Sequence, residues 1–210
     1  MGKETVKIQL DSNVALFALL FISVIILAFH ISIVMNGATG FAVSAVEKPF
    51  DINTIQSTRD SIKALYPVEN IKSAEDAMAM ILPTGTPEYA SKLPVSYGDG
   101  ERSLLAWVQI YQTTKLTPEQ AKRYLNLATK PLGISCEFCC GVGPVGITYQ
   151  GQLKCGCKHN PAAQGITMWL IQNTDYTDAQ IVREVLRWKA TWYPRNMVME
   201  AVKAAQESQS

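Results

Sequence analysis

Residues 136–161 read CEFCCGVGPVGITYQGQLKCGCKHNP and contain all five cysteines of the 210-residue chain. Two groups of cysteines frame this stretch, C-x-x-C-C over 136–140 and C-x-C over 155–157. Two close groups of cysteines separated by a turn commonly bring four thiolates to one tetrahedral ion. The stretch is therefore expected to fold around a metal ion.

Six soft donors are candidate ligands, which is more than one tetrahedral ion uses: Cys136, Cys139, Cys140, Cys155, Cys157 and His159. The four expected core ligands are Cys136, Cys139, Cys155 and Cys157, with Cys140 and His159 as alternates or neighbouring partners. Disulfide bonds and an exchanging thiol are the alternatives. The odd number of cysteines leaves one thiol unpaired, and closely spaced pairs constrain an unfolded chain weakly, so a metal is favoured.

Thiolate-rich sites bind zinc, Cu(I) or an iron–sulfur cluster. Residues 37–210 contain a single histidine, which excludes a Rieske centre, a blue-copper site and a three-histidine zinc. Zinc is the expected metal, and an iron–sulfur cluster is the first alternative because four cysteines suffice for it. Cu(I) is the second alternative, with added support only from the pairs Met78/Met80 and Met197/Met199.

The strand signal of the sequence lies between the two cysteine groups. Residues 147–149 and 153–155 flank Gln150-Gly151-Gln152, a pattern typical of a short β-hairpin. An isolated hairpin is marginally stable in water, so the metal is expected to hold it in place.

Helix signals surround the cysteine stretch on both sides. Ser73, Thr117 and Thr177 are expected N-caps, and Asn160-Pro161 is expected to open the helix after the cysteines. The predicted helices cover 55–65, 74–82, 101–112, 118–130, 161–172, 178–193 and 196–206. Arg183, Glu184 and Arg187 are interpreted as surface ion pairs.

A long apolar run precedes this helical part. Val14–Met35 carries no charge and would span roughly 33 Å as a helix, about the thickness of a bilayer. With Lys3 and Lys7 before it, the positive-inside rule places the N-terminus in the cytoplasm. Cleavage at a small-residue site over 43–45 is the alternative.

The predicted architecture is mainly α, with a β-hairpin metal-site insertion. It comprises a cytoplasmic tail (1–12), a transmembrane helix (13–36), a linker (37–53) and an extracytoplasmic helical domain (54–210) with its cysteine cluster over 136–159. This organisation predicts a single-pass cell-membrane protein.

A formal net charge of +1 gives no support for nucleic-acid binding. No convergent acid–base set identifies an enzyme, and G-x-G-x-x-G over 141–146 lacks the strand and helix of a dinucleotide site. The sequence therefore favours a membrane-anchored metal-binding protein with a structural or recognition role, docking onto a membrane or envelope protein. Electron transfer or redox sensing by an iron–sulfur cluster and Cu(I) trafficking are the alternatives.

The motif CEFCCG over 136–141, followed by C-G-C-x-H over 155–159 and by Arg187-Trp-Lys189 before Tyr193-Pro194, resembles a group of uncharacterised archaeal single-span membrane proteins. The resemblance extends from about residue 80 to about residue 195. It implies a membrane-tethered, cysteine-rich metal domain and supplies no catalytic residue.

Overall fold

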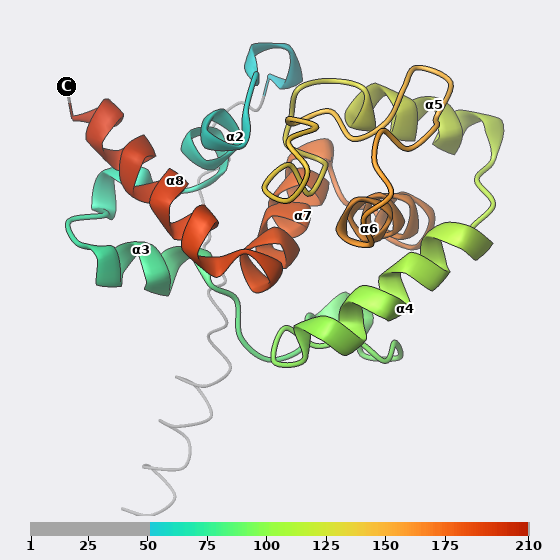
Figure 1. The fold of residues 1–210 in the computed structure, drawn as a ribbon, viewed down its shortest axis with the longest axis horizontal. Helices are drawn as coiled ribbons and strands as arrows, with labels where there is room; N and C mark the ends of the chain where they lie inside the picture. The colour runs from blue at the N-terminus through green and yellow to red at the C-terminus, as the bar shows by residue number, and fades with distance from the viewer. Residues whose placement is uncertain (1–50, 210) are drawn as a thin grey trace, which may run out of the picture. The chain divides into compact units, whose positions relative to one another are not determined.

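A computed structural model describes residues 51–209, which fall within one compact unit, Ser44–Ser210. These residues are mainly helical and contain no β-strand (Figure 1). The α-helices are α2 (Thr58–Leu65), α3 (Ala74–Ile81), α4 (Gly100–Thr113), α5 (Pro118–Ala128), α6 (His159–Asn173), α7 (Asp178–Trp192) and α8 (Pro194–Ser208). Three short 3-10 helices are η1 (Ile52–Thr54), η2 (Val68–Asn70) and η3 (Glu88–Ala90).

Local capping fixes where several helices begin, as the sequence predicts. Ser73, Thr117 and Thr177 each accept a hydrogen bond from the backbone three residues later, completing capping boxes at α3, α5 and α7. The start of α2 differs from the prediction, because Ser57 caps it and the helix therefore begins at Thr58 rather than at Ile55. The helix after the cysteines also begins earlier than predicted, at His159, and its Lys158 cap has no side-chain bond.

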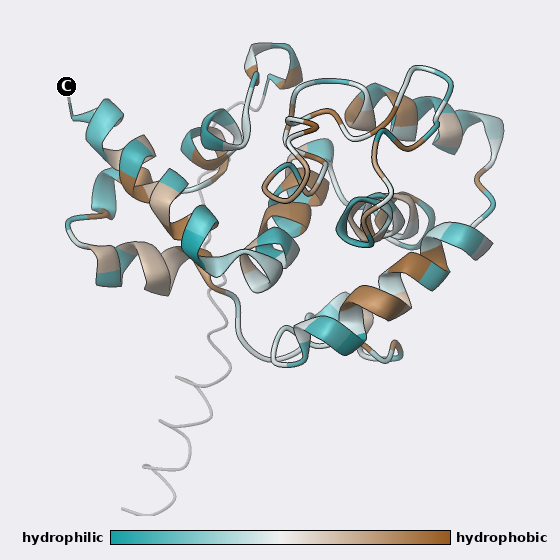
Figure 2. Cartoon of the chain, viewed as in Figure 1, coloured by the Kyte–Doolittle hydropathy of each residue, from teal (hydrophilic) through white to brown (hydrophobic). Residues whose placement is uncertain are grey.

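Helix α6 is the central element of one layer. Most of its residues are buried, and it packs against α4, α5 and α7 (Figure 1). Gly165 permits the closest approach, since a Cβ there would collide with the carbonyl oxygen of Trp107 on α4. Helix α6 is thus buried on nearly all sides. In α5 and α8, by contrast, hydrophilic and hydrophobic residues alternate along the ribbon (Figure 2).

The second layer consists of α2, α3 and α8, with α7 joining it to the first. Aromatic rings fill the junction: Trp107 and Trp188 are fully buried, with their ring centroids 5.6 Å apart. The cysteine loop, defined here as residues 129–158, connects α5 to α6 and lies over the ends of α6 and α7 (Figure 1). The cysteine loop thus ends at the N-terminus of α6, the most buried of the described helices.

The predicted β-hairpin over 147–155 is wrong. A single antiparallel bridge joins Ile147 to Leu153, with the Thr148 amide donating to the Gln152 carbonyl at 2.8 Å, and no strand extends from it. The second arm of a longer hairpin would have to continue into Cys155, and the residue two places before the first arm, Val145, is bridged to Ile134 instead. The insertion is therefore an irregular loop, and the fold-class prediction is corrected accordingly.

The predicted transmembrane helix (13–36), the tail before it and most of the linker lie outside the described residues. Over residues 51–209, no helix combines the length and the apolar character needed to cross a bilayer. The prediction of a single-pass membrane protein with an extracytoplasmic domain is corrected by this finding and is not carried further.

Candidate metal centre

Four cysteine sulfurs from the two ends of the cysteine loop converge on one point. The Sγ atoms of Cys136, Cys140, Cys155 and Cys157 all lie within 4.8 Å of one another. Cys136 and Cys157 are 3.2 Å apart, and Cys155 and Cys157 are 3.3 Å apart, sulfur to sulfur. All five cysteines belong to the described residues, and all are free thiols.

The spacing of these sulfurs suits a tetrahedral thiolate site. A Zn–S bond of about 2.3 Å places two sulfurs of a regular tetrahedron about 3.8 Å apart. That separation lies between the shortest sulfur–sulfur distance in the cluster, 3.2 Å, and the upper limit of 4.8 Å for all pairs. Small side-chain rotations would therefore bring all four sulfurs around a common ion.

The four-sulfur set includes Cys140 and leaves out its neighbour Cys139. Cys139 is exposed, and its thiol lies near the hydroxyl of Tyr193. His159 also lies outside the set. Its imidazole packs against Tyr193, with centroids 4.9 Å apart, and against Trp192 at 5.7 Å, and burial lowers the pKa of His159.

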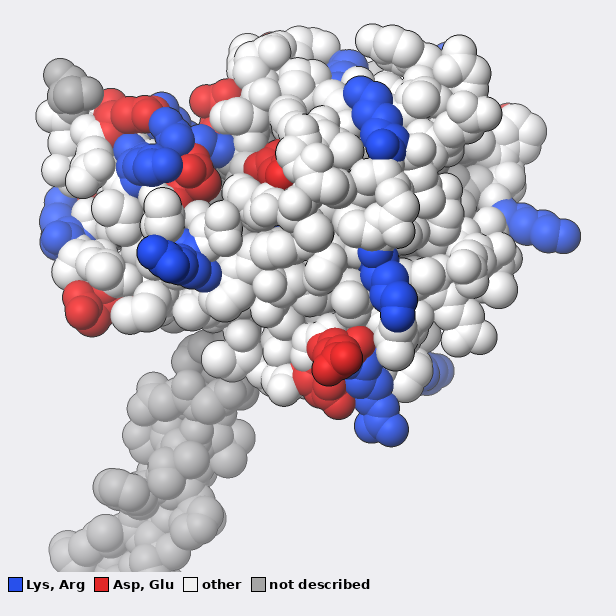
Figure 3. Space-filling view, viewed as in Figure 1, with Lys and Arg blue, Asp and Glu red and all other residues white. Residues whose placement is uncertain are grey.

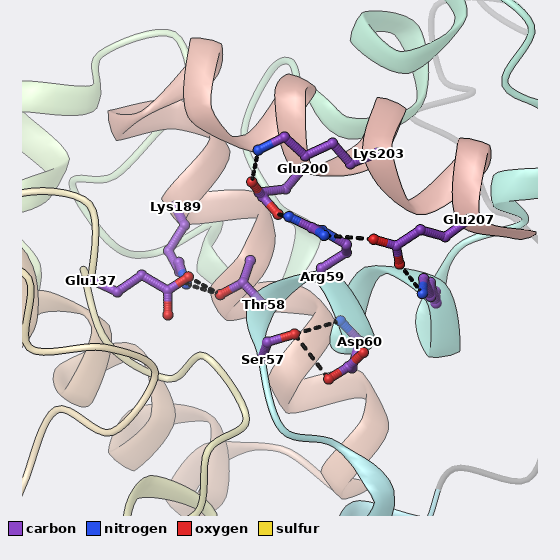
Figure 4. Close-up of polar contacts among 10 residues, drawn as sticks. Ser57, Thr58, Arg59, Asp60, Glu137, Lys189, Glu200, Lys203 and Glu207 are labelled. Carbon is purple, nitrogen blue, oxygen red and sulfur yellow. Dashed lines mark hydrogen bonds and ion pairs between the residues drawn. The ribbon is translucent and has the colours of Figure 1, made fainter.

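A buried ion pair anchors the first cysteine group to the helical core. Lys189 of α7 is fully buried and donates to the Gly133 carbonyl at 2.8 Å and to the Thr58 hydroxyl at 2.7 Å. Its ammonium lies 3.4 Å from a carboxylate oxygen of Glu137, which also accepts from Thr58 (Figure 4). Glu137 follows Cys136 directly, so the contact ties that end of the loop to α2 and α7.

Glu137 adopts a backbone conformation that is unusual for a residue with a side chain. Its φ is 28°, whereas the other positive values among the described residues belong to glycines. This conformation turns the chain sharply after Cys136. The bonds of the Glu137 carboxylate to Lys189 and Thr58 stabilise the turn against its steric cost.

Two buried amides on α6 hold both arms of the loop. Asn160 donates to the Gly146 carbonyl at 2.8 Å, and Gln164, one turn later, donates to the Ile134 carbonyl at 2.8 Å. The hydroxyl of Tyr124 on α5 donates to Gln164 at 3.1 Å. These bonds satisfy backbone carbonyls that an irregular buried loop would otherwise leave unpaired.

The thiols differ in burial and in acidity. Cys136 is buried and Cys140 is exposed, with Cys155 and Cys157 between them. Burial, followed by the hydrogen bond with Cys157, raises the pKa of Cys136, and the hydrogen bond with Cys155 raises the pKa of Cys140 to about 11. Burial opposes ionisation of Cys155, but hydrogen bonds led by that from Cys140 outweigh it and lower its pKa. Cys155 is thus more disposed than Cys136 or Cys140 to lose its proton.

Sequence reasoning missed the residues that support the centre. Glu137, Gln164 and Lys189 each carry an ordinary surface side chain, and nothing in their spacing separates them from exposed neighbours. Only the apolar residues next to Gln164 in the sequence of α6 hint that this polar side chain is buried. Such supporting bonds orient metal ligands and are as much part of a site as the ligands themselves.

No known protein family, curated protein or solved structure matches the chain. The chemistry of the centre is therefore what indicates a function. Four convergent cysteines can hold a soft or borderline metal ion, and the described residues around them supply hydrogen bonds and packing.

Proposed function

We propose that the cysteine centre holds one structural zinc ion and that the ion fixes the cysteine loop as a recognition surface. The ligands are Cys136, Cys140, Cys155 and Cys157. The observation that carries the proposal is the meeting of four sulfurs from both ends of a loop that has no strand of its own. Four thiolates leave no coordination position open for a substrate, which is typical of structural zinc rather than catalytic zinc.

Metal analysis of protein purified without oxygen tests this function. The expected result is one zinc per chain in a colourless protein that releases the metal to a strong chelator. A brown protein that absorbs visible light and contains iron would replace zinc with an iron–sulfur cluster. Protein without metal, with cysteines joined by disulfides after anaerobic purification, would overturn the proposal.

The metal-binding variant and its control differ in one pair of positions. Replacing Cys155 and Cys157 with Ser should abolish stoichiometric zinc binding, because it removes two of the four ligands. Adding Ser91→Cys and Ser96→Cys to that double variant returns two thiols at other positions and should not restore zinc binding. Stoichiometric zinc in the Cys155/Cys157 double variant would show that the ion is held elsewhere.

A further inference from the structure

The cysteine loop presents an exposed tyrosine on a rigid turn. Tyr149 is 81% exposed and lies in the turn over 148–151. The Gly151 amide donates to the Thr148 carbonyl at 2.9 Å, and the Gln152 amide donates to the Thr148 hydroxyl at 3.2 Å. Tyrosine is enriched at interface hot spots, and a pre-ordered turn lowers the entropic cost of binding.

The base of the turn is tied to the core and to the centre. Ile147 is buried, and the Lys154 amide donates to the Gly146 carbonyl at 2.9 Å. That carbonyl also accepts from Asn160 at 2.8 Å. Cys155 follows Lys154 directly, so a metal bound at the centre restrains the turn that carries Tyr149.

A shallow hollow on α5 lies beside this turn. Its volume is about 580 Å³, and it is lined by Glu119, Lys122, Arg123, Leu125, Asn126 and Thr129. A Cβ on Gly151 would be 3.7 Å from the Leu125 side chain, which places the tip of the turn at the edge of the hollow. The turn that carries Tyr149 therefore lies beside Leu125, which shares the hollow with Lys122.

The segment that supplies this surface, residues 114–173, is rich in basic side chains. Residues 114–173 contain six basic side chains against two acidic ones, Glu119 and Glu137, while acids outnumber bases in the rest of the described chain. The basic residues are Lys115, Lys122, Arg123, Lys130, Lys154 and Lys158. In Figure 3, blue groups predominate over α5 and the cysteine loop, whereas red and blue groups mix over α2 and α8.

Two of the basic groups already have partners within the molecule. Arg123 pairs with Asp178 at 2.8 Å, and Lys130 donates to Asn53 at 3.1 Å. Lys122, Lys154 and Lys158 are exposed around the hollow and the loop. Glu137 lies on the side of the loop that faces Lys189, whereas Glu119 lines the hollow together with Lys122, so one acid offsets part of the charge of the three lysines.

We propose that Tyr149, the α5 hollow and the lysines at 122, 154 and 158 form a docking surface for an acidic peptide segment of a partner protein. This proposal rests on the proposed function, because the metal fixes the loop. Three exposed lysines, one exposed ring and the side chain of Leu125 suit a peptide with acidic and leucine-like side chains. Nucleic acid would require more phosphate contacts than these lysines provide.

Fluorescence anisotropy with a labelled synthetic peptide of Glu, Asp and Leu tests the surface on the zinc-loaded protein. Replacing both Lys154 and Lys158 with Glu should weaken binding at least about tenfold, since each reversal turns an attraction into a repulsion. The matched control replaces Lys92 and Arg102 with Glu, an equal change of charge at exposed sites far along the chain. It should change the affinity less than about twofold.

The contribution of the aromatic ring is measured separately. Tyr149→Ser should weaken peptide binding about tenfold or more, while Leu105→Ser, which alters another exposed apolar residue, should not. An equal loss of peptide affinity in the Lys154/Lys158 and the Lys92/Arg102 charge-reversal variants would overturn the proposed docking surface. So would tighter binding to a single-stranded oligonucleotide or to phosphatidylserine vesicles than to the peptide.

Removing the metal with a chelator distinguishes an error in the proposed docking surface from an error in the proposed zinc site. The metal-free protein should bind the peptide at least about tenfold more weakly, because ordering the loop then adds to the cost of binding. A protein that binds zinc but not the peptide would overturn the surface alone. A protein that binds the peptide without ever binding zinc would overturn the proposed function and its link to the surface.

Discussion

At the residue scale, the structure selects one of two adjacent cysteines. The chain turns sharply at Glu137, and after this turn the sulfur of Cys140, rather than that of Cys139, lies with the other three. A C-x-x-C spacing favours Cys139, and the sequence alone contains no sign of a left-handed residue at Glu137. The number of available sulfurs could be predicted, but their selection could not.

Serine substitutions at Cys139 and Cys140 should affect zinc affinity to different extents. Cys140→Ser should weaken zinc binding by at least about tenfold, because losing a ligand costs no less than losing a supporting contact. Cys139→Ser should leave affinity within about twofold. Competition with a chromophoric chelator measures both, and a larger effect from Cys139→Ser would show that Cys139 is the ligand.

Removing the buried ammonium of Lys189 should be costly. Lys189→Met leaves Glu137 nearly buried without its cation, since Glu137 is 12% exposed, and breaking such a pair costs about 3–5 kcal/mol. Chemical denaturation measures the loss of unfolding free energy. Adding Glu137→Gln should recover part of it, and a double variant no more stable than Lys189→Met would contradict the coupling.

The burial of Glu184 cannot be predicted from the sequence. The spacing predicts a surface ion pair, but the Glu184 side chain is 4% exposed and accepts hydrogen bonds from Tyr89 and Tyr97. Arg187 lies 3.2 Å from its other oxygen. Spacing along a helix predicts that Glu184 and Arg187 meet, but only the packing of distant tyrosines decides that the pair is covered.

At the element scale, helix starts are predictable because their signals are local. A capping box involves residues three apart, so Ser73, Thr117 and Thr177 identify their helices without any tertiary information. The hairpin prediction was wrong because alternation over three residues does not fix a strand whose ends belong to other turns. Asn160 shows the same limit, since its amide bonds the Gly146 carbonyl instead of capping α6.

Glycine at position 165 should be essential to the packing of α4 on α6. Gly165→Ala places a Cβ against the Trp107 carbonyl and 3.1 Å from the Tyr111 amide nitrogen, so the helices must separate. Overpacking of this kind costs about 1–3 kcal/mol. Gly98→Ala is the control, because the nearest atom to its Cβ would be 3.6 Å away. Thermal unfolding of both variants measures the difference, and equal melting temperatures would contradict the close approach.

At the scale of the whole molecule, the helical core and the metal centre are separate sources of order. The contacts among α2, α3, α4, α6, α7 and α8 involve helices outside the cysteine loop. The loop, by contrast, contains two isolated bridges and is held by side-chain hydrogen bonds and by the buried side chains of Leu132, Ile134 and Ile147. The metal is therefore expected to order the loop more than the fold.

Chelation should expose the loop to trypsin while the helices persist. Cleavage after Lys154 and Lys158, which flank the second cysteine group, should accelerate at least about tenfold when zinc is removed. Far-ultraviolet circular dichroism should change little over the same treatment. Loss of most helical signal on chelation would mean instead that the ion is required for the entire fold.

The graded burial of the four sulfurs has a kinetic consequence. Cys136 lies at the closed side of the centre and Cys140 at the open side. A chelator would reach a bound ion from the solvent side, so Cys140 would be the first ligand displaced and Cys136 the last. The rate of metal release would then depend most on the ligand that is most exposed, and replacing Cys140 would accelerate it.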